Sequence, residues 1–144
     1  MRRHYAAVIL YREDEVLIVR YKEASRHPIG TFTIPAGEFE LYDRDMRDTA
    51  VREIEEETGL KIDRKRLVRL GKYNFTMQRK VGEEGLTTTL YACNRFLGDL
   101  KGGNETEPCW VKIDDYIAGM YPKPRMSGNF AEDINWFLTQ VKRP

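Results

Sequence analysis

The stretch REIEEETGL, residues 52–60, carries four glutamates in five consecutive positions behind an arginine and ends in Gly-Leu. On a helix, Glu53, Glu56 and Glu57 share one face within a sector of about 100°, whereas Glu55 points away. Like charges on one face repel, and Mg²⁺ offsets such repulsion because it prefers oxygen ligands. The stretch therefore predicts a metal-binding carboxylate face, with an ordinary solvated acidic helix as the alternative.

The residues around this stretch predict a helix over 45–58. An apolar stripe that includes Ala50 and Ile54 lies beside the carboxylates and can pack on a sheet. Gly59 ends the helix, because a residue without a Cβ readily takes the left-handed conformation that closes one. We expect the three carboxylates to lie at the edge of the buried helix face.

The rest of the chain alternates β-branched or aromatic runs with polar loops. These runs predict strands at 4–11, 16–21, 31–34, 66–75, 87–96 and 109–113. The first two form a hairpin, and 77–85 and 98–108 are expected to be loops. Asn129 and Glu132 resemble a capping box that opens an amphipathic C-terminal helix. Strands with helices at the middle and the end favour an α/β or α+β sandwich, in which a mixed sheet lies between helices.

The composition predicts one compact domain. The chain has 144 residues, of which 41% are hydrophobic. Its 24 Lys and Arg residues nearly balance 23 Asp and Glu residues, so neither a nucleic acid nor a membrane is expected as the main partner.

The lack of a recognisable targeting signal and the usage of cysteine indicate a cytoplasmic protein. The apolar run after the N-terminal arginines is short and lacks a small-residue cleavage site, so it predicts a strand rather than a signal peptide. No stretch approaches the roughly 20 apolar residues of a membrane span. Cys93 and Cys109 lack CxxC spacing and are expected to be buried hydrophobes. We expect a soluble, reduced, cytoplasmic protein.

The string Arg52-Glu53-Ile54-x-Glu56-Glu57-x-Gly59-Leu60 resembles the core of the Nudix hydrolase box, REUxEExGU, where U is aliphatic. Upstream, IPAGEFE resembles the strand end and glycine that open the longer motif, Gx5Ex7REUxEExGU. The resemblance implies a MutT-like Nudix domain over 1–144, with its box at approximately 37–60, and the family's α/β/α sandwich.

The upstream half of the motif departs from the family pattern. The position of the family's first glutamate holds Arg44, and the position of its glycine holds Glu38. Gly37 followed by five residues reaches Asp43, which is one residue too far from Arg52. A one-residue insertion accounts for this, with Asp43 or Asp45 in place of the missing carboxylate. Activity is expected to be retained.

The resemblance implies a Mg²⁺- or Mn²⁺-dependent pyrophosphohydrolase that cleaves a phosphoanhydride of a nucleoside diphosphate linked to another moiety. Glu56 and Glu57 then correspond to metal ligands, and Glu53 to a ligand or to the group that orients or deprotonates the attacking water. Arg52 holds the glutamates in position. The carbonyl of Gly37 is a further family ligand.

Some family members place the base on a distant loop, where this chain offers acids at 83, 84, 105 and 107. Glu105 is the preferred extra metal ligand, although plain solvation is an alternative for each. Arg20, Lys22 and Arg79 are candidates for contacting substrate phosphates. The two histidines, His4 and His27, are expected to be solvated or capping.

The class of substrate is inferred by elimination. Family members that cleave ADP-ribose often carry a proline downstream of the box, yet none occurs between Pro35 and Pro108. Dinucleoside polyphosphate hydrolases often carry a tyrosine at a similar offset after the box, where this chain has Phe75 and Thr76, with Tyr73 slightly early. A nucleoside triphosphate or damaged nucleotide is therefore expected. ADP-ribose, a nucleotide sugar or a dinucleoside polyphosphate remains an alternative.

A different class of function is also open, because a catalytically silent Nudix domain that binds a nucleotide or a protein would carry the same box. Many relatives are dimers, so the resemblance leaves a homodimer open.

Overall fold

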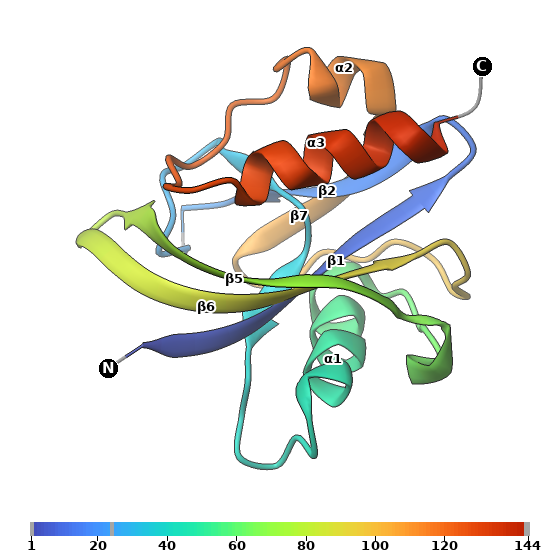
Figure 1. The fold of residues 1–144 in the computed structure, drawn as a ribbon, viewed down its shortest axis with the longest axis horizontal. Coiled ribbons are helices and arrows are strands. Elements are labelled where there is room, and N and C mark those ends of the chain that lie inside the picture. Colours follow the sequence, from blue (N-terminus) through green and yellow to red (C-terminus); the bar gives the residue numbers. More distant parts are fainter. Residues whose placement is uncertain (1, 24, 143–144) are drawn as a thin grey trace.

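A computed structural model describes residues 2–23 and 25–142. The elements are β1 (Arg3–Arg12), β2 (Glu15–Tyr21), β3 (Phe32–Thr33), β4 (Ala36–Glu38), α1 (Met46–Thr58), the 3-10 turn η1 (Arg64–Arg66), β5 (Val68–Arg79), β6 (Gly82–Cys93), β7 (Thr106–Lys112), α2 (Ile113–Ile117) and α3 (Phe130–Val141). The sheet lies between α1 on one side and α2 with α3 on the other (Figure 1). The predicted α+β sandwich is confirmed.

Strand β1 is the centre of a mixed sheet, which has seven strands in the described part of the chain. It pairs in parallel with β6, from Arg3 opposite Leu86 to Leu10 opposite Cys93. It pairs antiparallel with β2 and with β4. Strand β5 extends the sheet beyond β6, and β7 extends it beyond β2.

The central place of β1 follows from its sequence, which is apolar on both faces. Tyr5, Ala7 and Ile9 face a core that includes Phe130, Ile134 and Leu138 of α3. The alternate residues Ala6, Val8 and Leu10 face a second core with Ala50 and Ile54 of α1. Successive strand residues point to opposite faces, so a strand apolar throughout is covered on both sides.

Helix α1 has the boundaries that its capping residues dictate. The Asp45 side chain accepts a hydrogen bond from the Asp48 amide at 3.1 Å. Gly59 closes the helix at φ 79°, and a Cβ there would lie 2.7 Å from the carbonyl oxygen of Asp99. The predicted stop at Gly59 is confirmed.

Other boundaries differ from the sequence-based expectation. The predicted loop at 77–85 is mostly strand, because β5 and β6 continue to a tight turn at Lys80 and Val81. The short elements β4 and α2 were not predicted, and β7 starts before residue 109. Asn129 is the residue before α3, but its side chain makes no capping hydrogen bond.

None of the helices in the described ranges is long and apolar enough to cross a membrane.

Candidate active site

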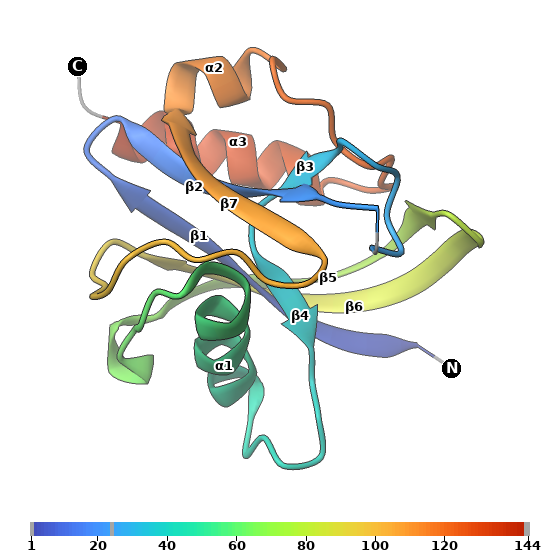
Figure 2. The same cartoon turned by 180° about the vertical axis from the view of Figure 1, so that it is seen from behind.

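A cleft of about 510 Å³ lies where β4, α1 and the loop before β7 meet. Figure 2 shows β4 beside α1, with the chain leading into β7 close to both. Six glutamates line this cleft: Glu38, Glu40, Glu53, Glu56, Glu57 and Glu105. Other elements contribute Tyr5, Tyr21, Arg26, His27 and Arg79. The cleft thus combines a concentration of carboxylates with cationic and aromatic groups.

The packing of β4 against α1 brings Gly37 and Glu53 together. A Cβ built on Gly37 would overlap the carboxyl group of Glu53. A side chain at position 37 would therefore displace the Glu53 carboxyl group from its place beside β4. The carboxyl group of Glu53 is held against the β4 backbone, and its side chain is 17% exposed.

The three glutamates predicted to share a helix face do so. Glu53, Glu56 and Glu57 all line the cleft, whereas Glu55 is exposed elsewhere. Glu57 accepts a hydrogen bond from the amide of Ala36 at 3.0 Å. Helix α1 therefore presents its carboxylates to β4 in the register that the sequence indicates.

Burial disfavours the ionised form of two of these carboxyl groups. Desolvation raises the pKa of Glu53 to about 7, although Arg52 opposes the shift. Desolvation, reinforced by the charge of Glu53, also raises the pKa of Glu57 well above its ordinary value. Two adjacent desolvated acids are costly to ionise without a cation.

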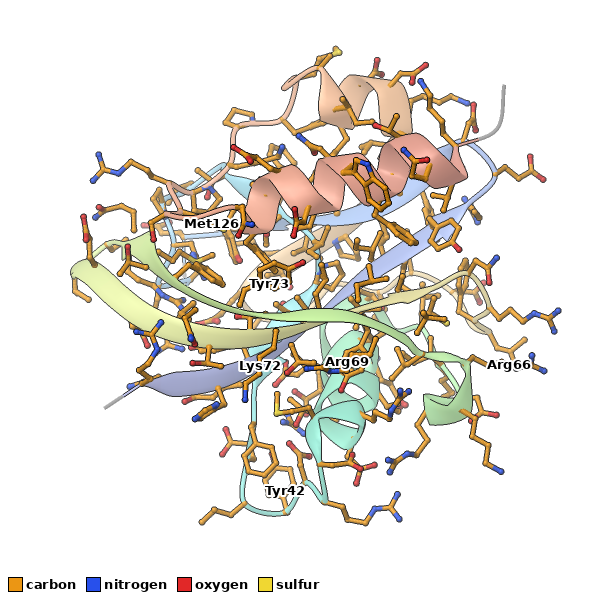
Figure 3. All side chains as sticks on the ribbon, in the orientation of Figure 1. Tyr42, Arg66, Arg69, Lys72, Tyr73 and Met126 are labelled. Carbon is orange, nitrogen blue, oxygen red and sulfur yellow. The ribbon has the colours of Figure 1, made fainter. Side chains whose placement is uncertain are left out.

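Arg52 holds this group of acids together. Its guanidinium donates to Glu53 at 2.8 Å, to the carbonyl of Glu38 at 2.9 Å and, more weakly, to Glu56 at 3.4 Å. It also lies over the ring of Tyr42, 5.1 Å from the centroid; Figure 3 labels this tyrosine in the loop before α1. Arg52 thus positions the cleft carboxylates without lining the cleft itself.

Asp43 is the acid that Arg52 engages in the loop before α1. Both of its carboxylate oxygens accept from Arg52, at 3.1 and 2.8 Å, and Thr49 donates to it at 2.9 Å. The hydrogen bonds from Arg52 lower the pKa of Asp43 to about 2. Asp45 instead caps α1 and pairs with Arg64. Asp43, and not Asp45, therefore supplies the carboxylate beside Arg52.

The donor set fits a hard divalent cation by its chemistry. Within residues 2–23 and 25–142, no three Asp, Glu, His or Cys side chains are grouped as a preformed metal site. Nevertheless, Glu53 and Glu57 offer desolvated carboxyl oxygens beside the Gly37 backbone, where any side chain would fill the space. A bound cation would offset the charge that burial disfavours.

Of the three basic residues predicted to contact substrate phosphates, only one lines the cleft. Arg79 lines the cleft and is only 4% exposed. Arg20 is ion-paired with Glu107, and Lys22 donates to the carbonyl of Gly103 at 2.9 Å. The structure does not bring Arg20 or Lys22 into the cleft lining.

His27 corrects the sequence-based expectation. It was expected to be solvated or capping, but it is buried in the cleft wall and stacks on Tyr21, with ring centroids 3.8 Å apart. Arg79 contacts its Nε2 at 2.7 Å. Arg26, which also lines the cleft, was not predicted. Both residues lie in an irregular segment without periodicity, so no local sequence signal marks their burial.

The loop acids that were candidates for a distant base lie in different surroundings. Glu105, the candidate for an extra metal ligand, lines the cleft. Glu83 pairs with Arg125, and Glu84 pairs with Arg3 and Arg79. Tyr73, labelled in Figure 3, donates to Asp133 of α3 at 2.7 Å.

Comparisons with known proteins identify a family and a fold. A family model of the NUDIX domain matches residues 1–130. The chain is similar to a structure from a study of MutT from Aliivibrio salmonicida and Vibrio cholerae, with 20% identity, a TM-score of 0.68, and 97% of this chain and 98% of that chain covered. A MutT NUDIX hydrolase from Burkholderia pseudomallei gives 21% identity, a TM-score of 0.67 and 99% coverage of both chains.

A third structure, the NUDIX domain of Shewanella oneidensis NrtR in complex with ADP ribose, gives a TM-score of 0.73 at 15% identity. It covers 99% of this chain and 90% of that chain. No curated protein matches the sequence. At these identities the structural likeness concerns the fold alone.

Proposed function

This chain belongs to the NUDIX domain family, and on that premise we propose that it is a Mg²⁺- or Mn²⁺-dependent pyrophosphohydrolase acting on a nucleotide. The observation that carries the proposal is the convergence of Glu53, Glu56 and Glu57 on one cleft beside Gly37. We place one such domain over residues 1–144.

Each residue has a role that its surroundings support. Glu53, Glu56 and Glu57 would hold the cation with the Gly37 carbonyl, and Glu105 would add a ligand from its loop. When bound, the metal ion neutralises phosphate charge and lowers the pKa of water. Glu53, whose pKa burial raises to about 7, can also take a proton from water near neutral pH. Arg52 keeps the carboxylates oriented, and Arg79 supplies a buried positive charge for the phosphate chain.

The favoured substrate is a nucleoside triphosphate or a damaged nucleotide. The absence of the downstream proline between Pro35 and Pro108 supports this choice over ADP-ribose. ADP-ribose or a related nucleotide is the second candidate, because ADP ribose is the ligand in the NrtR structure.

A panel of nucleotides tests the proposal. Release of phosphate or pyrophosphate with Mg²⁺ is compared among wild type, Glu56→Gln and the matched control Glu55→Gln on the same helix. We expect activity on at least one nucleotide, a loss of about 100-fold or more in Glu56→Gln, and little change in Glu55→Gln. Wild type no faster than Glu56→Gln on every substrate would favour a silent binding domain instead.

A further inference from the structure

A second hollow, of about 410 Å³, lies between the 3-10 turn η1 and the loop that follows β6. It shares no lining residue with the cleft of the candidate active site. Its volume falls within the range of sites that bind small molecules, roughly 300–1,000 Å³. Three basic side chains line it together with one acid: Lys61, Arg66, Arg95 and Asp63. The excess of positive charge is the reverse of the carboxylate-lined cleft.

The three basic side chains of the hollow have no anionic partner in the part of the chain that the structure describes. None of the ion pairs there involves Lys61, Arg66 or Arg95. The carboxylate of Asp63 instead accepts a hydrogen bond from the amide of Lys65 at 2.9 Å. Like charges that share a hollow repel one another, and a bound anion offsets this repulsion. The hollow is therefore suited to an anionic group.

Hydrogen bonds within the protein hold the walls of the hollow in place. The backbones of Lys61 and Leu97 exchange two of them, with N–O distances of 2.8 and 2.9 Å. Arg47 of α1 donates to the carbonyls of Arg64 and Leu67, at 3.1 and 2.8 Å, and so fixes η1 against the helix. A site whose backbone is held in this way loses little conformational entropy when a molecule binds.

The remaining lining residues add an amide and an apolar wall. Asn94 offers both donor and acceptor atoms. Phe96 stacks on Trp110, with ring centroids 5.3 Å apart, and Leu97 is 76% exposed. Covering such apolar surface with the organic part of a bound molecule is favourable. The combination of cationic groups and an apolar wall suits an organic phosphate better than a bare ion.

We propose that this hollow binds the phosphate group of a small organic phosphate ester. The guanidinium groups of Arg66 and Arg95 suit paired hydrogen bonds to phosphate oxygens, and Lys61 adds a point charge. Phe96 and Leu97 contact the organic part of the ester. The proposal does not depend on metal binding or hydrolysis in the cleft, so either proposal stands when the other fails.

A longer anion, such as a nucleic acid, would need positive charge beyond the hollow. Residues 61–72 contain six basic residues and one acid. Figure 3 labels three of the basic residues, Arg66, Arg69 and Lys72, along η1 and β5. Arg69 and Lys72 do not line the hollow. The walls and the apolar surface belong to the hollow alone, and they favour a small ligand.

An NMR titration locates the binding site directly. Phenyl phosphate and inorganic phosphate are each titrated into the full chain near pH 8 without divalent metal ions, where both probes are mainly dianions. Phenyl phosphate should shift the amide signals of residues 61–66 and 94–97, and it should bind about fivefold more tightly than inorganic phosphate. No shift of these signals, shifts confined to the cleft, or equal affinity for the two probes would overturn the proposal.

Variants separate the hollow from a diffuse basic surface. Lys65 and Arg66 are both exposed in η1, but only Arg66 lines the hollow. Arg66→Gln should weaken the binding of phenyl phosphate about tenfold, because a charge-assisted hydrogen bond is lost. Lys65→Gln and Lys72→Gln should change it by less than about twofold, since salt screens charges outside the hollow.

The amide spectrum of each variant shows whether it is folded, and Arg95→Gln replaces Arg66→Gln where the latter is not. Equal losses of affinity in the hollow variant and in the two control variants would indicate a diffuse surface for a polyanion and would overturn the small-ligand site.

Discussion

Arg52 is the residue that connects the loop before α1 to the carboxylates of the cleft. Its guanidinium contacts Asp43 on one side and Glu53 on the other, and it reaches the β4 backbone through the carbonyl of Glu38. Asp43 is almost completely buried, with 4% of its side chain exposed. Removing one partner of such a pair leaves the other charge poorly compensated.

Asp43→Asn should lower the free energy of unfolding by about 3 kcal/mol near pH 7. The pKa of Asp43 is about 2 in the folded protein, against an ordinary value of 3.8. A depressed folded-state pKa stabilises the protein above the unfolded-state value, and this contribution is lost as pH falls through the folded-state value. The difference between wild type and variant, measured by urea unfolding, should therefore shrink from about pH 4 to pH 2. A constant difference over that range would contradict the ion pair.

Gly37→Ala tests the close approach of Glu53 to β4. The new Cβ would overlap the Glu53 carboxyl group and displace it. We expect a loss of about 1–3 kcal/mol in stability and about 100-fold in kcat. Gly102→Ala is the matched control, since its Cβ would meet its nearest neighbour at an ordinary 3.4 Å. Equal kcat in the two variants would show that the Glu53 position is unimportant.

At the scale of elements, α1 joins stability to function through its carboxylate face. One side of the helix packs Ala50 and Ile54 into the core, and the adjacent side places Glu53 and Glu57 in the cleft. Burial raises the pKa of both acids. Ionisation of either acid therefore destabilises the folded protein when no metal ion is bound.

Glu53→Gln should make the metal-free protein less sensitive to rising pH. The folded-state pKa of Glu53 is about 7, above its ordinary value of 4.5. A raised folded-state pKa stabilises the protein below the unfolded-state value, and this contribution is lost as pH rises through the folded-state value. Between about pH 4.5 and pH 7.5, wild type should lose roughly 3 kcal/mol relative to Glu53→Gln.

Added Mg²⁺ should restore the stability of wild type at the upper end of this range, and it should have less effect on Glu53→Gln. Thermal unfolding at several pH values, with and without Mg²⁺, measures both effects. Parallel pH profiles for the two proteins would contradict the raised pKa of Glu53.

Local sequence patterns predicted α1 and the alternation of its charged and apolar faces. Gly59 marks the helix end through backbone sterics, and the i, i+3, i+4 spacing places the three glutamates, so both features are local. Strand β4 has three residues, and it exists because β1 offers partners that no short-range pattern specifies. The continuation of β5 was missed because the polar sequence of its end conceals the inward alternation of Met77 and Arg79.

For the whole molecule, the cleft depends on contacts between distant parts of the chain. Tyr5 from β1, His27 from the segment after β2 and Arg79 from the end of β5 meet only in the folded sheet. The acids that α1 places in the cleft could therefore be predicted from one helix, whereas the buried histidine could not. The same difference explains why Asp43 was recognised only as one of two candidates: its pairing with Arg52 depends on the path of the loop between β4 and α1.

The central claim is that the carboxylates of α1 and the backbone of β4 together hold the divalent cation. A crystal soaked in Mn²⁺ and measured at the manganese absorption edge locates the ion directly. The account predicts an anomalous peak among Glu53, Glu56, Glu57 and the carbonyl of Gly37. A peak elsewhere, with none in this cleft, would contradict it.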